Sequence, residues 1–160
     1  MGKEQKTNAM RILDSMKIAY EYHTYQCDEF IDAVHIADML GQPYEKMYKT
    51  LVTIGSSKNY YVFVLPIDRE LDRKKAARSV GEKEVTMIPV KEINRVTGYI
   101  RGGCTPIGMK KQYMTRIAEP ARTLSKIIVS GGRLGIQIDL APEDLCRASG
   151  AEYADILVDV

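Results

Sequence analysis

Apolar residues recur at intervals of three and four in several segments of the chain, the spacing of an amphipathic helix. Met10, Leu13 and Met16 predict a first helix over residues 7–17. In the next segment of this kind, Asp32 is the expected N-cap and Gly41 the expected terminator. The same reasoning predicts a short helix from residue 43 and further helices over residues 72–80, 90–96 and 142–149.

Continuous or alternating apolar runs predict strands between these helices, over residues 19–25, 49–55, 60–66, 84–88, 114–118, 126–130 and 135–140. Residues 56–59 are typical of a hairpin between the second and third strands, and residues 131–133 of a turn between the last two. Strands and helices do not alternate regularly, which favours an α+β fold over a doubly wound one. We expect a single domain over residues 1–160, with residues 1–6 flexible.

Composition narrows the classes of function. The formal net charge is only +2 in 160 residues, so nucleic-acid binding has no support from net charge and would need a local basic patch. The three cysteines are scattered without a CxxC pair, which is typical of free thiols in a reducing cytosol. No apolar run reaches the roughly 18–20 residues needed to cross a bilayer. These features predict a cytoplasmic protein with no membrane association.

A glycine-rich loop with a basic rim occupies residues 97–111, TGYIRGGCTPIGMKK. Its glycines allow bare N–H groups to approach a ligand, its proline stiffens the loop, and its basic residues place positive charge at the edges. These residues are Gly102, Gly103, Gly108, Pro106, Arg101, Lys110 and Lys111. Such a loop suits a phosphate, a carboxylate or a developing oxyanion, although an ordinary ordered turn has the same composition. The dinucleotide and P-loop patterns are absent from it.

Lys49 is the second unusual feature, because it opens the apolar strand over residues 49–55. Lysine is rarely buried fully, since desolvation of the ammonium costs several kcal/mol unless it is paired or loses its proton. A lysine that snorkels at the strand end is one interpretation. The other is a lysine in a cleft, either as a cation that binds an anionic ligand or as a base with a lowered pKa.

Other reactive side chains give weaker indications. Cys104 lies in the glycine loop, but nothing in the sequence ties a base to it for nucleophilic catalysis. His23, Cys27 and His35 match no zinc spacing, so we expect no metal. Ser130 precedes two glycines and either belongs to a hairpin turn or lines a pocket.

Four segments occur together in one known family: YKTL at 48–51, TGYIRGGCTPIG at 97–108, IIVSGG at 127–132 and LAPEDL at 140–145. On these segments the chain resembles the YbaK/EbsC proteins, free-standing relatives of the editing domain inserted in bacterial prolyl-tRNA synthetases. The resemblance runs from the first helix to the last. It implies a mixed β-sheet or partly open barrel surrounded by helices.

The resemblance also implies trans-editing, the hydrolysis of an amino acid from the wrong tRNA, chiefly of Cys-tRNA(Pro). In such a substrate-assisted reaction the cysteinyl thiol attacks its own carbonyl and displaces the tRNA, with no protein nucleophile, metal or cofactor. The implied partners are the 3′ end of aminoacyl-tRNA and prolyl-tRNA synthetase. The expected quaternary state is a monomer or a weak homodimer.

The resemblance assigns roles to individual residues. Lys49 falls on the essential lysine of the family and is expected to position the 3′-terminal adenosine or its phosphate. Tyr25 falls on a tyrosine that lines the pocket, and Gln137 stands where some members carry an aspartate. The family's G-x-x-x-P loop, which holds the acyl group and the adenosine, matches Gly102, Gly103, Cys104, Thr105 and Pro106. Gly108 and Ser130 complete the expected substrate-binding set.

Three alternatives stay open from the sequence. A relative that clears alanine from tRNA would need a positioned water instead of the substrate thiol. A non-catalytic module for tRNA or synthetase binding would use basic residues, and the candidate tRNA contacts are Arg73, Lys74, Arg101, Lys110 and Lys111. A cysteine hydrolase would depend on Cys104.

Overall fold

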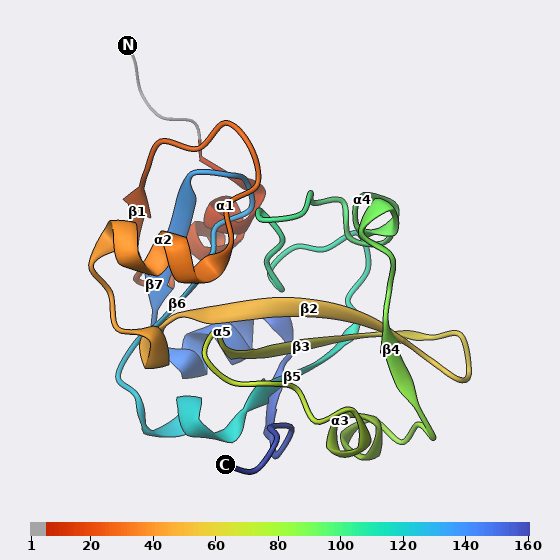
Figure 1. Cartoon of the computed structure of the whole chain (residues 1–160). Helices are drawn as coiled ribbons and strands as arrows, with labels where there is room; N and C mark the ends of the chain where they lie inside the picture. The colour runs from red at the N-terminus through yellow and green to blue at the C-terminus, as the bar shows by residue number, and fades with distance from the viewer. Residues whose placement is uncertain (1–5) are drawn as a thin grey trace.

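Two β-sheets form the framework of the computed structural model, which describes residues 6–160 (Figure 1). The larger sheet has the order β4-β2-β3-β5-β8 and the smaller the order β1-β7-β6. The larger sheet is mixed, since β2 is antiparallel to β3 and β4, whereas β5 is parallel to β3 and β8. The strands are β1 (Glu21–Thr24), β2 (Tyr48–Gly55), β3 (Tyr60–Pro66), β4 (Val85–Met87), β5 (Met114–Ala118), β6 (Ile127–Ser130), β7 (Ile136–Leu140) and β8 (Glu152–Ala154).

Short helices surround the sheets, and the first two of them begin at side-chain caps, of which the sequence predicts Asp32. The Thr7 hydroxyl accepts a hydrogen bond from the Met10 amide at 3.2 Å, and Asp32 accepts one from the His35 amide at 2.9 Å. The helices are α1 (Asn8–Ser15), α2 (Ala33–Leu40), α3 (Arg73–Ser79), α4 (Ile93–Thr97) and α5 (Pro142–Ser149), with 3-10 helices η1 (Tyr44–Lys46), η2 (Val90–Glu92) and η3 (Glu119–Thr123). No helix within residues 6–160 combines the length and apolar character that a bilayer crossing requires.

The two sheets meet where β2 passes β6, through an isolated parallel bridge between Met47 and Ile128. The continuous apolar run of β3 lies in the middle of the larger sheet, and Val62, Phe63, Val64 and Leu65 are completely buried there. Figure 1 shows α1 and α2 beside the smaller sheet, and α4 with the glycine loop on the same side of β2. The described residues form a partly open arrangement rather than a closed barrel.

The α+β fold and every predicted helix and strand are confirmed, with small changes in their ends. The helix predicted over residues 90–96 is the 3-10 helix η2 followed directly by α4, and it ends at Gly98 in the left-handed conformation. The sequence did not indicate η3 or β8. Of the segment expected to be flexible, residues 1–5 lie outside the described residues, while Lys6 pairs with Asp14 on α1.

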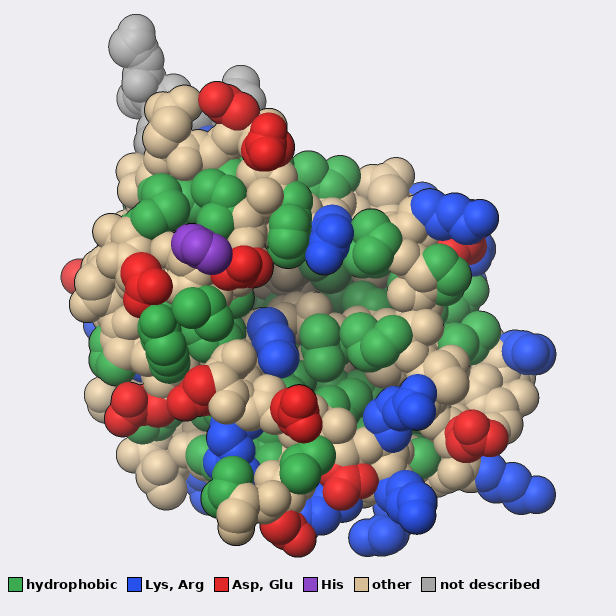
Figure 2. Space-filling view, viewed as in Figure 1, with side chains coloured by type: hydrophobic (Ala, Val, Ile, Leu, Met, Phe, Trp, Pro, Cys, Tyr) green, Lys and Arg blue, Asp and Glu red, His purple; other side chains and the backbone are tan. Residues whose placement is uncertain are grey.

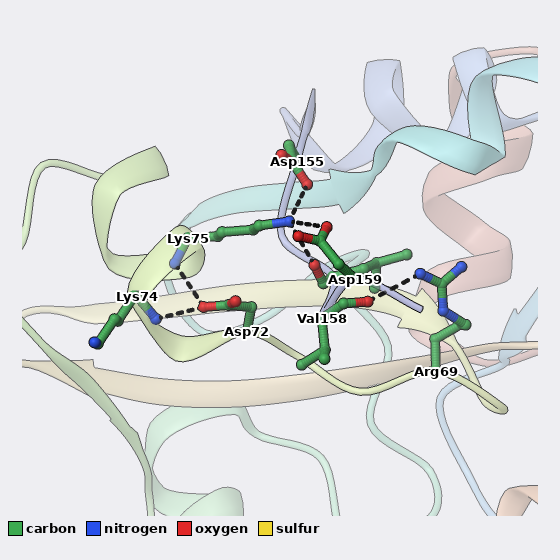
Figure 3. A network of polar contacts seen from close by, with 8 residues as sticks. Arg69, Asp72, Lys74, Lys75, Asp155, Val158 and Asp159 are labelled. Carbon is green, nitrogen blue, oxygen red and sulfur yellow. Dashed lines mark hydrogen bonds and ion pairs between the residues drawn. The ribbon is translucent and has the colours of Figure 1, made fainter.

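Residues 155–159 fasten the loop between β3 and α3 (Figure 3). The Lys75 ammonium, on α3, donates to the Asp159 and Asp155 carboxylates at 2.7 and 3.2 Å and to the Leu157 carbonyl at 2.9 Å. Within the loop, the Arg69 guanidinium donates to the Val158 carbonyl at 3.1 Å. We call residues 155–159 the terminal clamp, because these bonds tie α3 and the loop before it to a segment far away in the sequence.

Candidate functional site

A single cavity gathers many of the residues that the sequence picks out. It has a volume of about 390 Å³ and lies between β2, the glycine loop and the approach to α2. Figure 2 shows a hollow in this face of the molecule, with apolar side chains in and around it and basic groups at its edge. The expected site residues that line it are Lys49, Arg101, Gly102, Cys104, Ser130 and Gln137.

Lys49 reaches the cavity from the second residue of β2, opposite Leu65 of β3. Burial lowers the pKa of its ammonium, while the carboxylates of Glu70 and Asp68 act in the opposite direction. Among the described residues, Lys49 has no hydrogen bond or ion pair. A partly buried cation without a partner is suited to an anionic or strongly polar ligand.

Gln137 forms a polar part of the cavity wall and is only 4% exposed. The amide donates to the phenol oxygen of Tyr25 at 3.1 Å, so Tyr25 is positioned directly behind a cavity residue. In the smaller sheet, Gln137 lies between Ser130 of β6 and His23 of β1. The Ser130 hydroxyl donates to the Gly102 carbonyl at 3.2 Å and thereby ties the glycine loop to β6.

The glycine loop can reach this position because two of its residues lack a side chain where neighbouring atoms leave no room for one. Gly102 has φ +86°, and a Cβ there would lie 2.8 Å from the Leu134 side chain and 3.1 Å from that of Phe30. A Cβ on Gly103 would lie 2.8 Å from the Cα of Arg133 in the β6–β7 turn. The loop is therefore packed directly against the backbone of that turn.

Two amide groups of the loop have no acceptor among the described residues. The Gly103 amide donates to the Ile100 carbonyl at 2.9 Å, which closes a turn. Within residues 6–160, the N–H groups of Gly102 and Cys104 have no acceptor, and both residues line the cavity. Two unpaired backbone donors at one cavity can stabilise negative charge on an acyl oxygen.

The surroundings of Cys104 do not favour a nucleophilic thiolate. It is 8% exposed, and burial raises the pKa of its thiol to about 11. Within residues 6–160, its sulfur has one hydrogen-bonding contact, with the Thr97 hydroxyl at 4.0 Å, and neither described histidine contacts it. His23 lies 3.4 Å from the Asp139 carboxylate, and His35 contacts Asp32 at 2.9 Å.

Several expected site residues do not line the cavity. Thr105 and Pro106 are buried within the loop, and Gly103 and Gly108 pack against the β6–β7 turn and α1, respectively. The amine of Lys110 donates to the Arg95 carbonyl at 3.1 Å. Of the five candidate tRNA contacts, the four outside the cavity wall are Arg73, Lys74, Lys110 and Lys111. Arg73 and Lys74 lie on α3, on the side of the larger sheet away from the glycine loop (Figure 1).

Sequence reasoning missed the apolar half of the cavity. Phe30 and Ile31 precede α2, and Met87, Ile88, Val90 and Ile93 come from β4 and the helices that follow it. Phe30 and Met87 are 41% and 47% exposed, so the rim of the cavity presents apolar surface to solvent. Phe30 and Ile31 lie between predicted elements, whereas the other four belong to the strand predicted over residues 84–88 and the helix predicted over residues 90–96. Neither pattern indicates that these side chains meet at a cavity.

Comparison with known proteins identifies the family. A model of the aminoacyl-tRNA editing domain matches residues 29–148, from just before α2 nearly to the end of α5. The chain belongs to this family. The match includes every residue that lines the cavity, so the cavity lies wholly within the matched region of this chain.

Individual relatives agree with this assignment. EbsC of Enterococcus faecalis, provisionally named a Cys-tRNA(Pro)/Cys-tRNA(Cys) deacylase, is 45% identical over 154 residues, which are 96% of this chain and 94% of EbsC. A crystal structure provisionally described as a trans-editing enzyme for prolyl-tRNA synthetase superposes with a TM-score of 0.80 at 21% identity, covering 98% of this chain and 100% of the other. A second crystal structure, of a hypothetical protein, has a TM-score of 0.85 at 21% identity and covers 93% and 98% of the two chains. The two structures support the fold.

Proposed function

We propose that this protein is a trans-editing deacylase that removes cysteine from mischarged tRNA(Pro). The observation that carries the proposal is the meeting of Lys49 with the free amides of Gly102 and Cys104 at one cavity of an aminoacyl-tRNA editing domain. The 45% identity to EbsC over nearly the full length supports cysteine as the amino acid. The reaction belongs in the cytoplasm, where aminoacyl-tRNA is made and used.

The cavity is large enough for the aminoacylated 3′ end of a tRNA. Pockets for small molecules have volumes of about 300–1,000 Å³, and 390 Å³ is enough for an aminoacylated terminal nucleoside. In this arrangement the ester carbonyl lies at the Gly102 and Cys104 amides. The Lys49 ammonium binds the phosphate or ribose of the terminal adenosine and fixes its orientation.

The reaction needs no nucleophile from the protein. The sulfur of the substrate cysteine attacks its own carbonyl carbon, and the loop amides stabilise the oxyanion that forms. The bond to the ribose oxygen then breaks, the thiol proton passes to that oxygen, and the cysteinyl group leaves as a four-membered thiolactone. Water hydrolyses the thiolactone to free cysteine. Burial and the raised pKa of Cys104 agree with this route, because that thiol carries little thiolate near neutral pH.

The identity of the tRNA is supplied by a partner in this proposal. The net charge of +2 gives weak long-range attraction to tRNA, and Arg73 and Lys74 lie away from the cavity. Prolyl-tRNA synthetase, the enzyme that releases the mischarged product, is the partner that we infer. A monomer or weak homodimer remains our prediction for the free protein.

The test is deacylation of Cys-tRNA(Pro) and Ala-tRNA(Pro) by the wild type, Lys49→Ala and the control Lys83→Ala, which removes an exposed lysine outside the cavity. We expect rapid loss of cysteine, little loss of alanine, and at least a 100-fold slower reaction only for Lys49→Ala. A preference for alanine would move the protein to the alanine-clearing specificity. Binding of tRNA without turnover of either ester would favour the non-catalytic module.

A further inference from the structure

Phe30 and Arg101 form a cation–π pair at the cavity wall, although they are 71 positions apart in the sequence. The guanidinium carbon of Arg101 lies 3.8 Å from the centroid of the Phe30 ring. Both residues line the cavity, Arg101 is exposed, and Phe30 is 41% exposed. Among residues 6–160, Arg101 has no ion pair or side-chain hydrogen bond, and its guanidinium lies over the Phe30 ring.

The local backbone is adapted to this contact. Gly102 follows Arg101, and a Cβ at that glycine would lie 3.1 Å from the Phe30 ring. The missing side chain lets the ring pack against the loop while the guanidinium lies over it. A guanidinium that rests on an aromatic ring is held flat and keeps its donors at the edge of its plane.

A flat cation on an aromatic ring, at the wall of a cavity for an ester, has the chemistry of a nucleobase subsite. Proteins bind unpaired bases by stacking them on aromatic rings and on guanidinium planes, while the positive charge attracts the neighbouring phosphate. An exposed arginine that served only to solubilise the surface would not require an exposed phenylalanine beneath it. The polar part of the cavity, around Lys49 and Gln137, would meanwhile hold the ribose and the acyl group.

We propose that the Phe30–Arg101 pair is a stacking subsite for a nucleobase at the 3′ end of the tRNA. This inference rests on the proposed function, because it takes the acyl ester to be inside the cavity. Phe30 contacts the base through Arg101 and is therefore a positioning residue. The base comes either from the terminal adenosine or from the penultimate cytidine, and the two sources are distinguished by experiment.

The binding experiment uses the trinucleotide CCA with a fluorescent label on its 5′ end, and two versions in which the terminal or the penultimate nucleotide is abasic. The protein variants are Phe30→Leu, which keeps an apolar side chain without the ring, Phe30→Tyr, which keeps the ring, and Arg101→Lys, which keeps the charge without the plane. Met39→Leu is the control, an exposed residue of α2 outside the cavity wall. Melting temperatures show that each variant is folded.

We expect one abasic version to bind the wild type about 10-fold more weakly than CCA does, because loss of one stacked base has an effect of this size. Phe30→Leu and Arg101→Lys should weaken CCA about as much and should no longer distinguish that abasic version from CCA. Phe30→Tyr and Met39→Leu should stay within about twofold of the wild type. The subsite would be overturned if removal of either base weakened binding by the same factor in the wild type and in Phe30→Leu.

Turnover separates this inference from the proposed function. With Cys-tRNA(Pro), Phe30→Leu should raise KM about 10-fold and leave kcat within about twofold, because stacking acts on binding of the end and not on the ester. A fall in kcat at unchanged KM would contradict the subsite. A wild type that hydrolyses nothing would refute the proposed function, whereas the trinucleotide measurements would still decide the stacking.

Discussion

Replacement of Gly103 by alanine tests whether the glycine loop owes its position to close packing on the β6–β7 turn. An ideal Cβ at this position would lie 2.8, 3.0 and 3.1 Å from the Cα, C and N atoms of Arg133. All three are backbone atoms, so no side chain can rotate away to make room. The loop and the turn must separate, and overpacking of this kind typically costs about 1–3 kcal/mol.

The expected loss of stability is measurable by thermal unfolding. For a chain of this size, each kcal/mol lowers Tm by about 2–4 °C, so Gly103→Ala should lower it by roughly 2–12 °C. Separation of the loop from the turn also moves the amides of Gly102 and Cys104 away from the ester. We therefore expect kcat/KM for Cys-tRNA(Pro) to fall at least 10-fold at a temperature well below the unfolding transition.

Gly81→Ala is the matched control. Gly81 has φ +75° but nothing within 4 Å of an added Cβ, and it lies outside the cavity wall. This variant pays only the strain of a left-handed backbone, about 1–2 kcal/mol, and should keep the kcat/KM of the wild type. The reasoning is refuted if Gly103→Ala matches the wild type in both Tm and kcat/KM, since the loop would then yield at no cost.

Three further predictions follow from the site and the terminal clamp. Lys49→Met should be more stable than the wild type at pH 7, because it removes the cost of a buried ammonium. Since burial lowers the pKa of Lys49 in the folded state, the stability of the wild type rises with pH above that pKa. Urea titrations should therefore show that the difference in stability between the two proteins narrows toward pH 10.5. Cys104→Ala should keep turnover in the deacylation assay, and its complete loss would favour the cysteine hydrolase. Lys75→Ala should lower Tm, because it loses three bonds to the terminal clamp, and it should leave KM unchanged, because these bonds lie away from the cavity. An unchanged Tm would show that the three bonds contribute nothing to stability.

Local signals were sufficient for most elements of the fold. Asp32 and Gly41 set the two ends of α2, because a side-chain cap and a left-handed glycine act within one turn of the helix. Strand β8 escaped prediction since Glu152–Ala154 is short and only partly buried. It becomes a strand because the edge of β5 offers it a parallel partner, a property of the tertiary structure.

The candidate site was predictable in part. Lys49 and the glycine loop stand out by composition, and the family resemblance joins them, but no local pattern says which loop amides are left without acceptors. Phe30 shows why the rest was missed. It lies between predicted elements, and its contact with Arg101 exists only after the approach to α2 has packed against the glycine loop.

The terminal clamp has a consequence for the order in which the molecule assembles. Arg69, in the loop after β3, and Val158 are 89 residues apart in the sequence, so this loop is fixed only when a distant segment has been synthesised and has paired with it. Hairpin β2–β3, by contrast, closes over a few residues and can form early. During translation, the strand that carries Lys49 therefore exists before the loop with Asp68 and Glu70 is fixed beside it. At that stage the nascent chain contains Lys49, but the two carboxylates that act on its pKa are not yet in their final positions. The completed site therefore forms late.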